Sequence, residues 1–235
     1  MADDPNEVCS QMDLSIEEKD KLVAEVIRFI LFKTHQTGGC PIKRDELTQL
    51  VTKNYRQRLL PNLVINEAKE KLASIFGYEM RELQRLRPSS TNQGRASQQS
   101  LDAKSYVIIS QLHPDVYSEY VEDSSTTHVA GFTFSVLSII HLAGGRLSEE
   151  ELWKHLVRLG LRETDESHPV LGNVKLALEA LVQQRYIQKN KVNGPEGNIL
   201  MYELAERSSD PAVAEKLKEY ISQIIHDDTA AEEED

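Results

Sequence analysis

The sequence predicts a mainly helical protein with small β wings, built from two winged-helix domains in tandem. The clearest observation is residues 131–161, where apolar residues at helical spacing lead to Gly144–Gly145 and then to a second helix. Paired glycines permit the left-handed turn that ends a helix, and Ser148 and Glu151 form a capping-box pattern that begins the next one. A similar pattern surrounds Gly38–Gly39. In both halves a third helix and two strand-like segments follow, and this is the order of elements in a winged helix.

The first expected domain covers residues 15–112, after an acidic leader at 1–14 that we expect to be disordered. Ser15 and Glu18 form a capping box at the start of its first helix. We expect helices over 16–35, 43–58 and 61–76 and strands over 80–86 and 104–112. Residues 86–104 are polar and rich in Ser and Gln, which predicts a long, flexible wing between the strands.

A connector over 113–127 leads to the second expected domain, at 128–225. Its third helix begins after Asn173, which is a favourable capping residue. Strand-like segments then flank a GPEG turn, and this pattern predicts a hairpin wing. A last helix with one apolar face begins at Pro211, and we expect the acidic tail over 226–235 to be disordered.

Composition is that of an ordinary soluble globular protein, with 28% charged residues and a formal net charge of −11. The acids gather at the two ends, whereas residues 42–104 hold twelve basic against seven acidic side chains. Local clusters of cations, more than the overall charge, decide whether phosphates are attracted. Two distant cysteines, Cys9 and Cys40, give no disulfide framework and suit a reducing compartment. No signal peptide or membrane-spanning run is expected.

The sequence favours a non-enzymatic role. It lacks a glycine-rich phosphate loop, a GxSxG motif and a HExxH motif. Glu149, Glu150 and Glu151 are consecutive, so on a helix they splay apart instead of converging on a substrate, and they complement the helix dipole. The histidines show no paired ligand spacing with either cysteine, so we expect no metal site and no cofactor.

Two long segments resemble a known family. The segment over 26–83, which ends in IFGYEMREL, resembles the first half of a MAGE (melanoma-associated antigen) homology domain. The segment over 134–161, which contains EEELWKHL, resembles the second half, together with LVQQRYIQKNKV and MYELAERS. Because little sequence flanks these segments, the chain is most similar to the MAGE-type subunit (non-SMC element three) of the SMC five–six chromosome-maintenance complex. The resemblance implies a tandem winged-helix protein without catalytic residues.

The resemblance also implies protein partners: a RING-type subunit (non-SMC element one), a kleisin (non-SMC element four), and the SMC five–six heads or arms. Family members hold the RING partner through a dileucine in the first helix, which matches Ile30 and Leu31. Phe29 and Phe32 give that helix apolar surface on more than one side, so it is either central to its domain or in contact with a partner. The kleisin interface falls on Phe134, Leu137 and Trp153, for which core packing is the alternative role.

Double-stranded DNA is the last partner that the resemblance implies, and it requires cations that face phosphates. The matching basic positions of the second domain are Lys175, Arg185, Lys189 and Lys191. The alternative patch lies in the first wing, at Arg81, Arg85, Arg87 and Arg95, and a solvated charged face is the third interpretation. No aromatic residues interleave with these cations, so we expect backbone contacts with little sequence preference.

Three hypotheses follow. The first is a scaffold and DNA-binding subunit of the SMC five–six complex, located in the nucleus, which stimulates a RING ubiquitin ligase and supports DNA repair and recombination. The second is a MAGE-type regulator of a RING ubiquitin ligase that acts away from DNA. The third is a double winged-helix transcription regulator, which predicts marked sequence preference in DNA binding.

Overall fold

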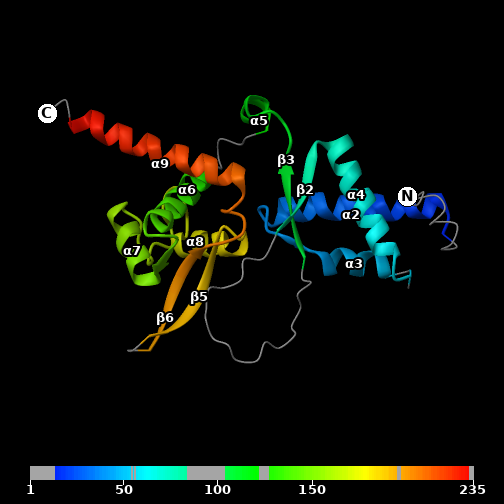
Figure 1. Ribbon diagram of the computed structural model, residues 1–235, viewed down its shortest axis with the longest axis horizontal. Coiled ribbons are helices and arrows are strands. Elements are labelled where there is room, and N and C mark those ends of the chain that lie inside the picture. The colour runs from blue at the N-terminus through cyan, green and yellow to red at the C-terminus, as the bar shows by residue number, and fades with distance from the viewer. Residues whose placement is uncertain are drawn as a thin grey trace. The chain divides into compact units, whose positions relative to one another are not determined.

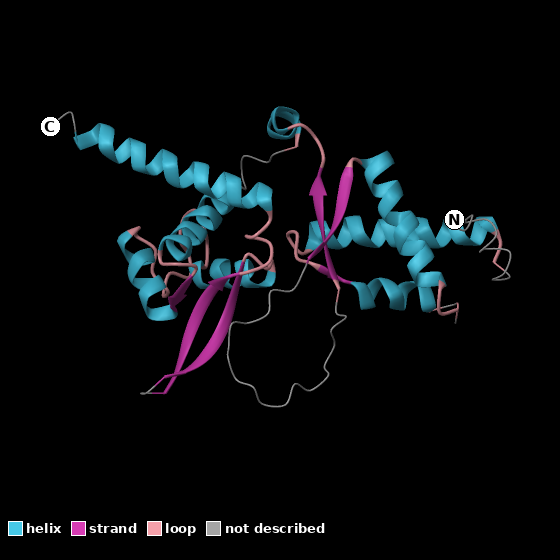
Figure 2. Ribbon diagram, viewed as in Figure 1, coloured by secondary structure: helices cyan, strands magenta, loops and turns pink. Residues whose placement is uncertain are grey.

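The fold divides into two units, at residues 1–114 and 115–235. The computed structural model describes residues 14–53, 55, 57–83, 104–121, 127–194 and 197–232. It is mainly helical, with one small antiparallel sheet in each unit (Figures 1 and 2).

The first unit contains three long helices and three strands. In chain order they are α2 (Ile16–Gln36), β1 (Ile42–Lys43), α3 (Arg44–Thr52), α4 (Leu60–Phe76), β2 (Tyr78–Leu83) and β3 (Ser105–Ser110). The sheet has the order β1-β3-β2, and Met80 pairs with Ile108 in the antiparallel β2–β3 register. Helices α2 and α4 cross each other and enclose most of the core (Figure 1).

Local sequence accounts for the start of α2 and the end of α4. The Ser15 hydroxyl accepts from the Glu18 N–H at 3.2 Å, and the Glu18 carboxylate accepts from the Ser15 N–H at 3.0 Å, which completes the predicted capping box. Gly77 ends α4 in the left-handed conformation, with φ of 67°. The first and third predicted helices are therefore confirmed. The second ends at Thr52 instead of 58. Lys, Arg and Gln are frequent among the residues that follow and are favourable in helices, so propensity does not account for this end, and Tyr55 packs against the core from the loop.

The second unit repeats the same order of elements. It contains α5 (Pro114–Tyr120), α6 (Thr127–Leu142), β4 (Arg146–Ser148), α7 (Glu149–Arg158), α8 (Val174–Gln183), β5 (Ile187–Gly194), β6 (Gly197–Leu204) and α9 (Pro211–Glu232). Its sheet has the order β4-β6-β5, and the β5–β6 hairpin projects as a long antiparallel pair (Figure 2). Helix α9 packs against α6, where Tyr220 meets Phe134 with 5.8 Å between ring centroids.

The structure differs from the expected organisation in two details, and it does not test a third. The expected connector contains helix α5, which begins at Pro114. The expected disordered tail from 226 is mostly helical, because α9 runs without a helix breaker to Glu232 and Ala230–Ala231 favour the helix. The long first wing, expected over 86–104, lies almost wholly outside the described residues.

Within the described part of the chain, no helix has both the length and the apolarity needed to cross a bilayer.

The cap of α7 supplies a stability prediction. The Ser148 hydroxyl accepts from the Glu151 N–H at 3.2 Å and donates to the Glu151 carboxylate at 2.7 Å. The hydrogen bond from the Ser148 hydroxyl and, second, the one from the Ser148 backbone N–H at 3.3 Å to this carboxylate lower the pKa of Glu151 below its ordinary value of 4.5. We expect Ser148→Ala to cost about 1 kcal/mol of unfolding free energy. A carboxyl pKa that is lower in the folded state stabilises the fold above pH 4.5, and this contribution fades as the pH falls further. The unfolding free energies of the two proteins, measured by urea melts, should therefore move closer together in acid.

Candidate partner-binding surfaces

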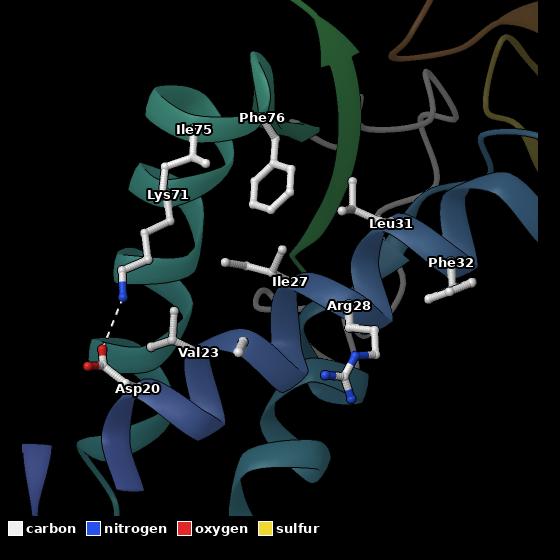
Figure 3. Close-up of a pocket in the computed structure, with 10 residues that line it drawn as sticks. Asp20, Val23, Ile27, Arg28, Leu31, Phe32, Lys71, Ile75 and Phe76 are labelled. Carbon is white, nitrogen blue, oxygen red and sulfur yellow. Dashed lines mark hydrogen bonds and ion pairs between the residues drawn. The ribbon is translucent and has the colours of Figure 1, made fainter. Parts of the chain in front are cut away.

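An apolar groove lies in the first unit between α2 and the end of α4 (Figure 3). Helix α2 builds one wall, because its apolar residues cover more than the face that the core needs. The groove is lined by Asp20, Val23, Ala24, Ile27, Arg28, Leu31, Phe32, Lys71, Ile75 and Phe76. In Figure 3, Ile27 and Leu31 of α2 and Phe76 of α4 point into the same space.

Large apolar side chains at this groove are open to solvent. Phe32 is 63% exposed, Ile75 67% and Phe76 47%. A cluster of large apolar side chains around a hollow, rimmed by charges, is typical of a protein-binding surface. The groove is therefore a candidate docking site for a partner's apolar side chains.

Of the two cations that line the groove, one is paired with acids and the other, among the described residues, is not. Lys71 Nζ lies 3.0 Å from Asp20 and 3.1 Å from Glu67, and these hydrogen bonds, Asp20 first, raise the pKa of its ammonium. Arg28, which also lines the groove, is exposed, and no carboxylate of the described residues lies within ion-pair distance of it. The groove thus carries one uncompensated positive charge.

The four residues expected to contact the RING partner do not all lie on this surface. Ile30 is fully buried in the core of the first unit, so its side chain is not exposed for the expected contact. Phe29 is half-buried against that core, and Lys33 Nζ lies 5.4 Å from its ring centroid. Leu31 and Phe32 line the groove. Of the two positions that match the family's dileucine, Leu31 lines the groove, whereas Ile30 packs inside the core.

The residues expected to contact the kleisin also differ in burial. Leu137 is fully buried in the core of the second unit and is not exposed for the expected contact, while Phe134 and Trp153 are half-buried against that core. Trp153 lines a shallow groove on α7 together with Val157, which is 50% exposed. Glu149, Glu150, Lys154, Arg158 and Glu163 form the rest of its lining.

The expected DNA-binding cations of the second unit are mostly paired with acids. Lys189 Nζ lies 2.6 Å from Glu149 and 5.3 Å from the ring centroid of Tyr202, whose hydroxyl donates to the same carboxylate at 3.3 Å. Burial opposes the charge on Lys189, but its hydrogen bonds to Glu149 and Tyr202 raise the pKa of the ammonium. Lys175 Nζ lies 2.8 Å from Glu163, and this bond raises its pKa.

Arg185 has a structural role in this unit. Its backbone has a φ of 63°, and its guanidinium lies 2.8 Å from Glu206, whose side chain is only 4% exposed. The second oxygen of Glu206 has no hydrogen-bond partner among the described residues. Moving Arg185 to a phosphate would leave a buried carboxylate uncompensated. The ion pair with Glu206 therefore competes with a phosphate contact, and DNA binding by Arg185 stays a prediction.

Lys191 is the expected cation that remains most available. It is exposed on edge strand β5, and no described residue forms an ion pair with it. In the alternative patch, Arg81 lies 2.6 Å from Glu79, and Arg85, Arg87 and Arg95 lie outside the described residues. Among the described residues of the second unit, three of the four expected cations are therefore paired with acids, and they do not form a continuous basic face with Lys191.

Comparison with known proteins identifies the family. The MAGE homology domain matches residues 26–213, which is most of the chain and includes both units. The chain belongs to the MAGE homology domain family. The mouse protein "Non-structural maintenance of chromosomes element 3 homolog" is 32% identical over 183 residues, which cover 77% of this chain and 57% of the mouse protein. Human "Melanoma-associated antigen F1" is 27% identical over 181 residues, which cover 75% of this chain and 52% of that protein.

The fold also matches a solved structure. A chain of the structure titled "Nse1-Nse3-Nse4 complex" aligns with a TM-score of 0.73 at 24% identity, covering 90% of this MAGE protein and 92% of that chain. At this identity the match establishes the fold. The MAGE protein spans about half the length of the two curated relatives above.

Sequence reasoning missed one wall of the groove in this MAGE protein. Ile75 and Phe76 follow the buried Leu72 by three and four residues, a spacing that at 100° per residue puts both within about 60° of its direction. Both are nevertheless exposed at the last turn of α4. Neither they nor Arg28 carried a sequence signal that set them apart.

Proposed function

We propose that this MAGE protein is a non-enzymatic scaffold subunit of the SMC five–six complex, in which it binds a RING-type ubiquitin ligase subunit and a kleisin. The observation that carries the proposal is the exposed apolar groove on the first helix of a MAGE homology domain. The similarity to the mouse element 3 homologue and the fold shared with a chain of the "Nse1-Nse3-Nse4 complex" support the choice of complex. The proposed location is the nucleus, and the proposed process is DNA repair and recombination.

Each unit is, on this proposal, a winged helix. The order helix, strand, helix, helix, strand, strand in both units supports this assignment, as does the pairing of the short first strand with the last strand of each hairpin. The RING-type subunit occupies the groove at Leu31 and Phe32, and the kleisin contacts the second unit near Trp153 and Val157. Phe134 meets Tyr220 of α9, and its contact with the kleisin stays a prediction.

The assembly is tested by reconstitution. The full chain is co-expressed with the RING-type and kleisin subunits of its own organism, and the mixture is fractionated by size. The proposal predicts one stable complex that contains one copy of each subunit. Elution of this chain apart from the RING-type subunit would overturn it.

Double-stranded DNA contact is proposed at the β5 edge, centred on Lys191. Exposed ion pairs contribute little, so Lys175 can exchange Glu163 for a phosphate, whereas Lys191 needs no exchange. Because few cations are available, binding should depend only modestly on salt, with a log–log slope of about −0.9 for each phosphate neutralised. Such contacts carry little sequence preference.

Charge reversal tests this surface. We expect Lys191→Glu to weaken the trimer's binding to duplex DNA about five- to tenfold near 50 mM salt and to reduce the slope by about one. Lys218→Glu on the exposed side of α9 is the matched control and should leave affinity unchanged. Unchanged affinity in Lys191→Glu would reject the β5 edge as the DNA surface.

A second function is favoured by the ion pairs just described. Because Lys175, Arg185 and Lys189 each meet an acid, a MAGE-type regulator of a RING ubiquitin ligase that acts away from DNA also accounts for this surface. That function predicts a RING partner without a kleisin and no measurable DNA binding by the complex.

A further inference from the structure

The first residue of α7 is tied to the β5–β6 hairpin of the second unit. The Glu149 carboxylate accepts from Lys189 Nζ on β5 at 2.6 Å and from the Tyr202 hydroxyl on β6 at 3.3 Å. Lys189 and Tyr202 are paired across the two strands, and the ammonium lies 5.3 Å from the ring centroid. Two donors of the hairpin therefore hold this carboxylate beside Lys189.

The charge of Glu149 also acts on the second lysine of this surface. Lys175, in the first turn of α8, lies 2.8 Å from Glu163. That hydrogen bond contributes most to raising the pKa of the Lys175 ammonium, and the charges of Glu163, Glu179 and Glu149 raise it further. Three carboxylates thus surround Lys175 and Lys189, so this part of the second unit has no excess of positive charge.

A DNA backbone that contacts Lys191 also approaches Lys189. The two lysines are two residues apart on β5, and side chains at that spacing point to the same face of a strand. The exposed Lys191 is available to a phosphate, whereas Lys189 is already bound to Glu149. The carboxylate opposes a second phosphate contact in two ways, because it occupies the ammonium and because like charges repel across an interface.

From this geometry we propose that Glu149 is an internal competitor of DNA, whose carboxylate holds Lys189 until a backbone phosphate replaces it. The inference rests on the proposed function, because it takes duplex DNA as the ligand of the β5 edge. It adds an acidic residue that limits the affinity.

Glu163 competes in the same way at Lys175, but less strongly. The side chains of Lys175 and Glu163 are 53% and 46% exposed, compared with 32% and 29% for Lys189 and Glu149. Solvent weakens exposed ion pairs, so the pair at Lys175 yields more readily to a phosphate.

Neutralising the competitor should strengthen DNA binding. We expect Glu149→Gln to tighten the binding of a fluorescently labelled duplex by the full chain about three- to tenfold near 50 mM salt, measured by anisotropy. Glu163→Gln should give a smaller gain. Glutamine at 149 keeps an oxygen that can accept from the Tyr202 hydroxyl, so thermal melts should show a folded protein.

Glu150→Gln is the matched control. Glu150 is the next residue of α7, and its carboxylate lies 2.7 Å from Lys154 Nζ. The substitution therefore also removes one acid from the start of α7 and releases one lysine, but Lys154 is outside the proposed DNA surface. Its affinity should change by less than about twofold.

A double-mutant cycle shows whether Glu149 acts through Lys189. The gain from Glu149→Gln should shrink in a chain that also carries Lys189→Gln, because the released cation is then missing. An equal gain with and without Lys189, or equal affinities of Glu149→Gln and Glu150→Gln, would overturn the inference while DNA contact by the second unit stands. If neither the unchanged chain nor Glu149→Gln binds duplex DNA, the proposed DNA contact fails and the inference fails with it.

Discussion

Phe32→Asp should abolish the association with the RING-type subunit while leaving the first unit folded. Phe32 is 63% exposed, so the folded monomer loses little by the change. On the proposed docking, the same side chain is buried in the complex, and a carboxylate at this position must give up its water inside an apolar groove. A central aromatic anchor contributes about 2–4 kcal/mol, so we expect affinity to fall by roughly thirty- to a thousandfold.

Isothermal titration of the RING-type subunit measures this loss, and thermal melts check the fold. Leu59→Asp is the matched control, because Leu59 is 62% exposed in the same unit and lies outside the groove. The control should bind normally and melt like the unchanged protein. Equal affinities for the two variants would exclude the groove as the RING interface.

Ile30→Ala should destabilise the whole first unit instead of acting as a selective interface mutation. Ile30 is fully buried among the residues of the first core, and the shortened side chain leaves a cavity. Such truncations cost about 2–5 kcal/mol of unfolding free energy. Leu31→Ala, one residue later, removes a half-buried side chain and should cost less stability but more partner affinity.

Urea unfolding and partner titration of both variants separate these effects. The expected pattern is a large shift of the unfolding midpoint for Ile30→Ala and a loss of affinity with a smaller shift for Leu31→Ala. An Ile30→Ala protein with unchanged stability and no partner binding would return Ile30 to the interface and contradict its place in the core.

Sequence reasoning succeeded where the structure depends on neighbours in the chain. The two capping boxes, at Ser15 and Ser148, and the glycine turns between the helices are set within a few residues. These signals predicted the start of α2, the start of α7 and the turns that follow α2 and α6. The end of helix two could not be predicted, because the residues after Thr52 include favourable helix formers and Tyr55 packs against the core only in the folded unit.

Surface charge was the least predictable feature because its partners come from distant positions. Glu149 reaches Lys189 across 40 residues of sequence, and Glu206 reaches Arg185 across 21. A list of cations along the chain therefore overstates the positive charge that a phosphate meets. Similarly, α2 is apolar on several sides, so its sequence alone did not decide whether Ile30 or Leu31 faces outward.

Affinity purification of the tagged full chain from a nuclear extract of its own organism tests the central claim most directly. The eluted proteins are identified by mass spectrometry, and Phe32→Asp and Leu59→Asp are purified in parallel. The account predicts a RING-type protein, a kleisin and SMC arms with the unchanged chain and with Leu59→Asp, and selective loss of the RING-type protein with Phe32→Asp. A RING-type protein recovered without kleisin or SMC arms, or retained by Phe32→Asp, would contradict it.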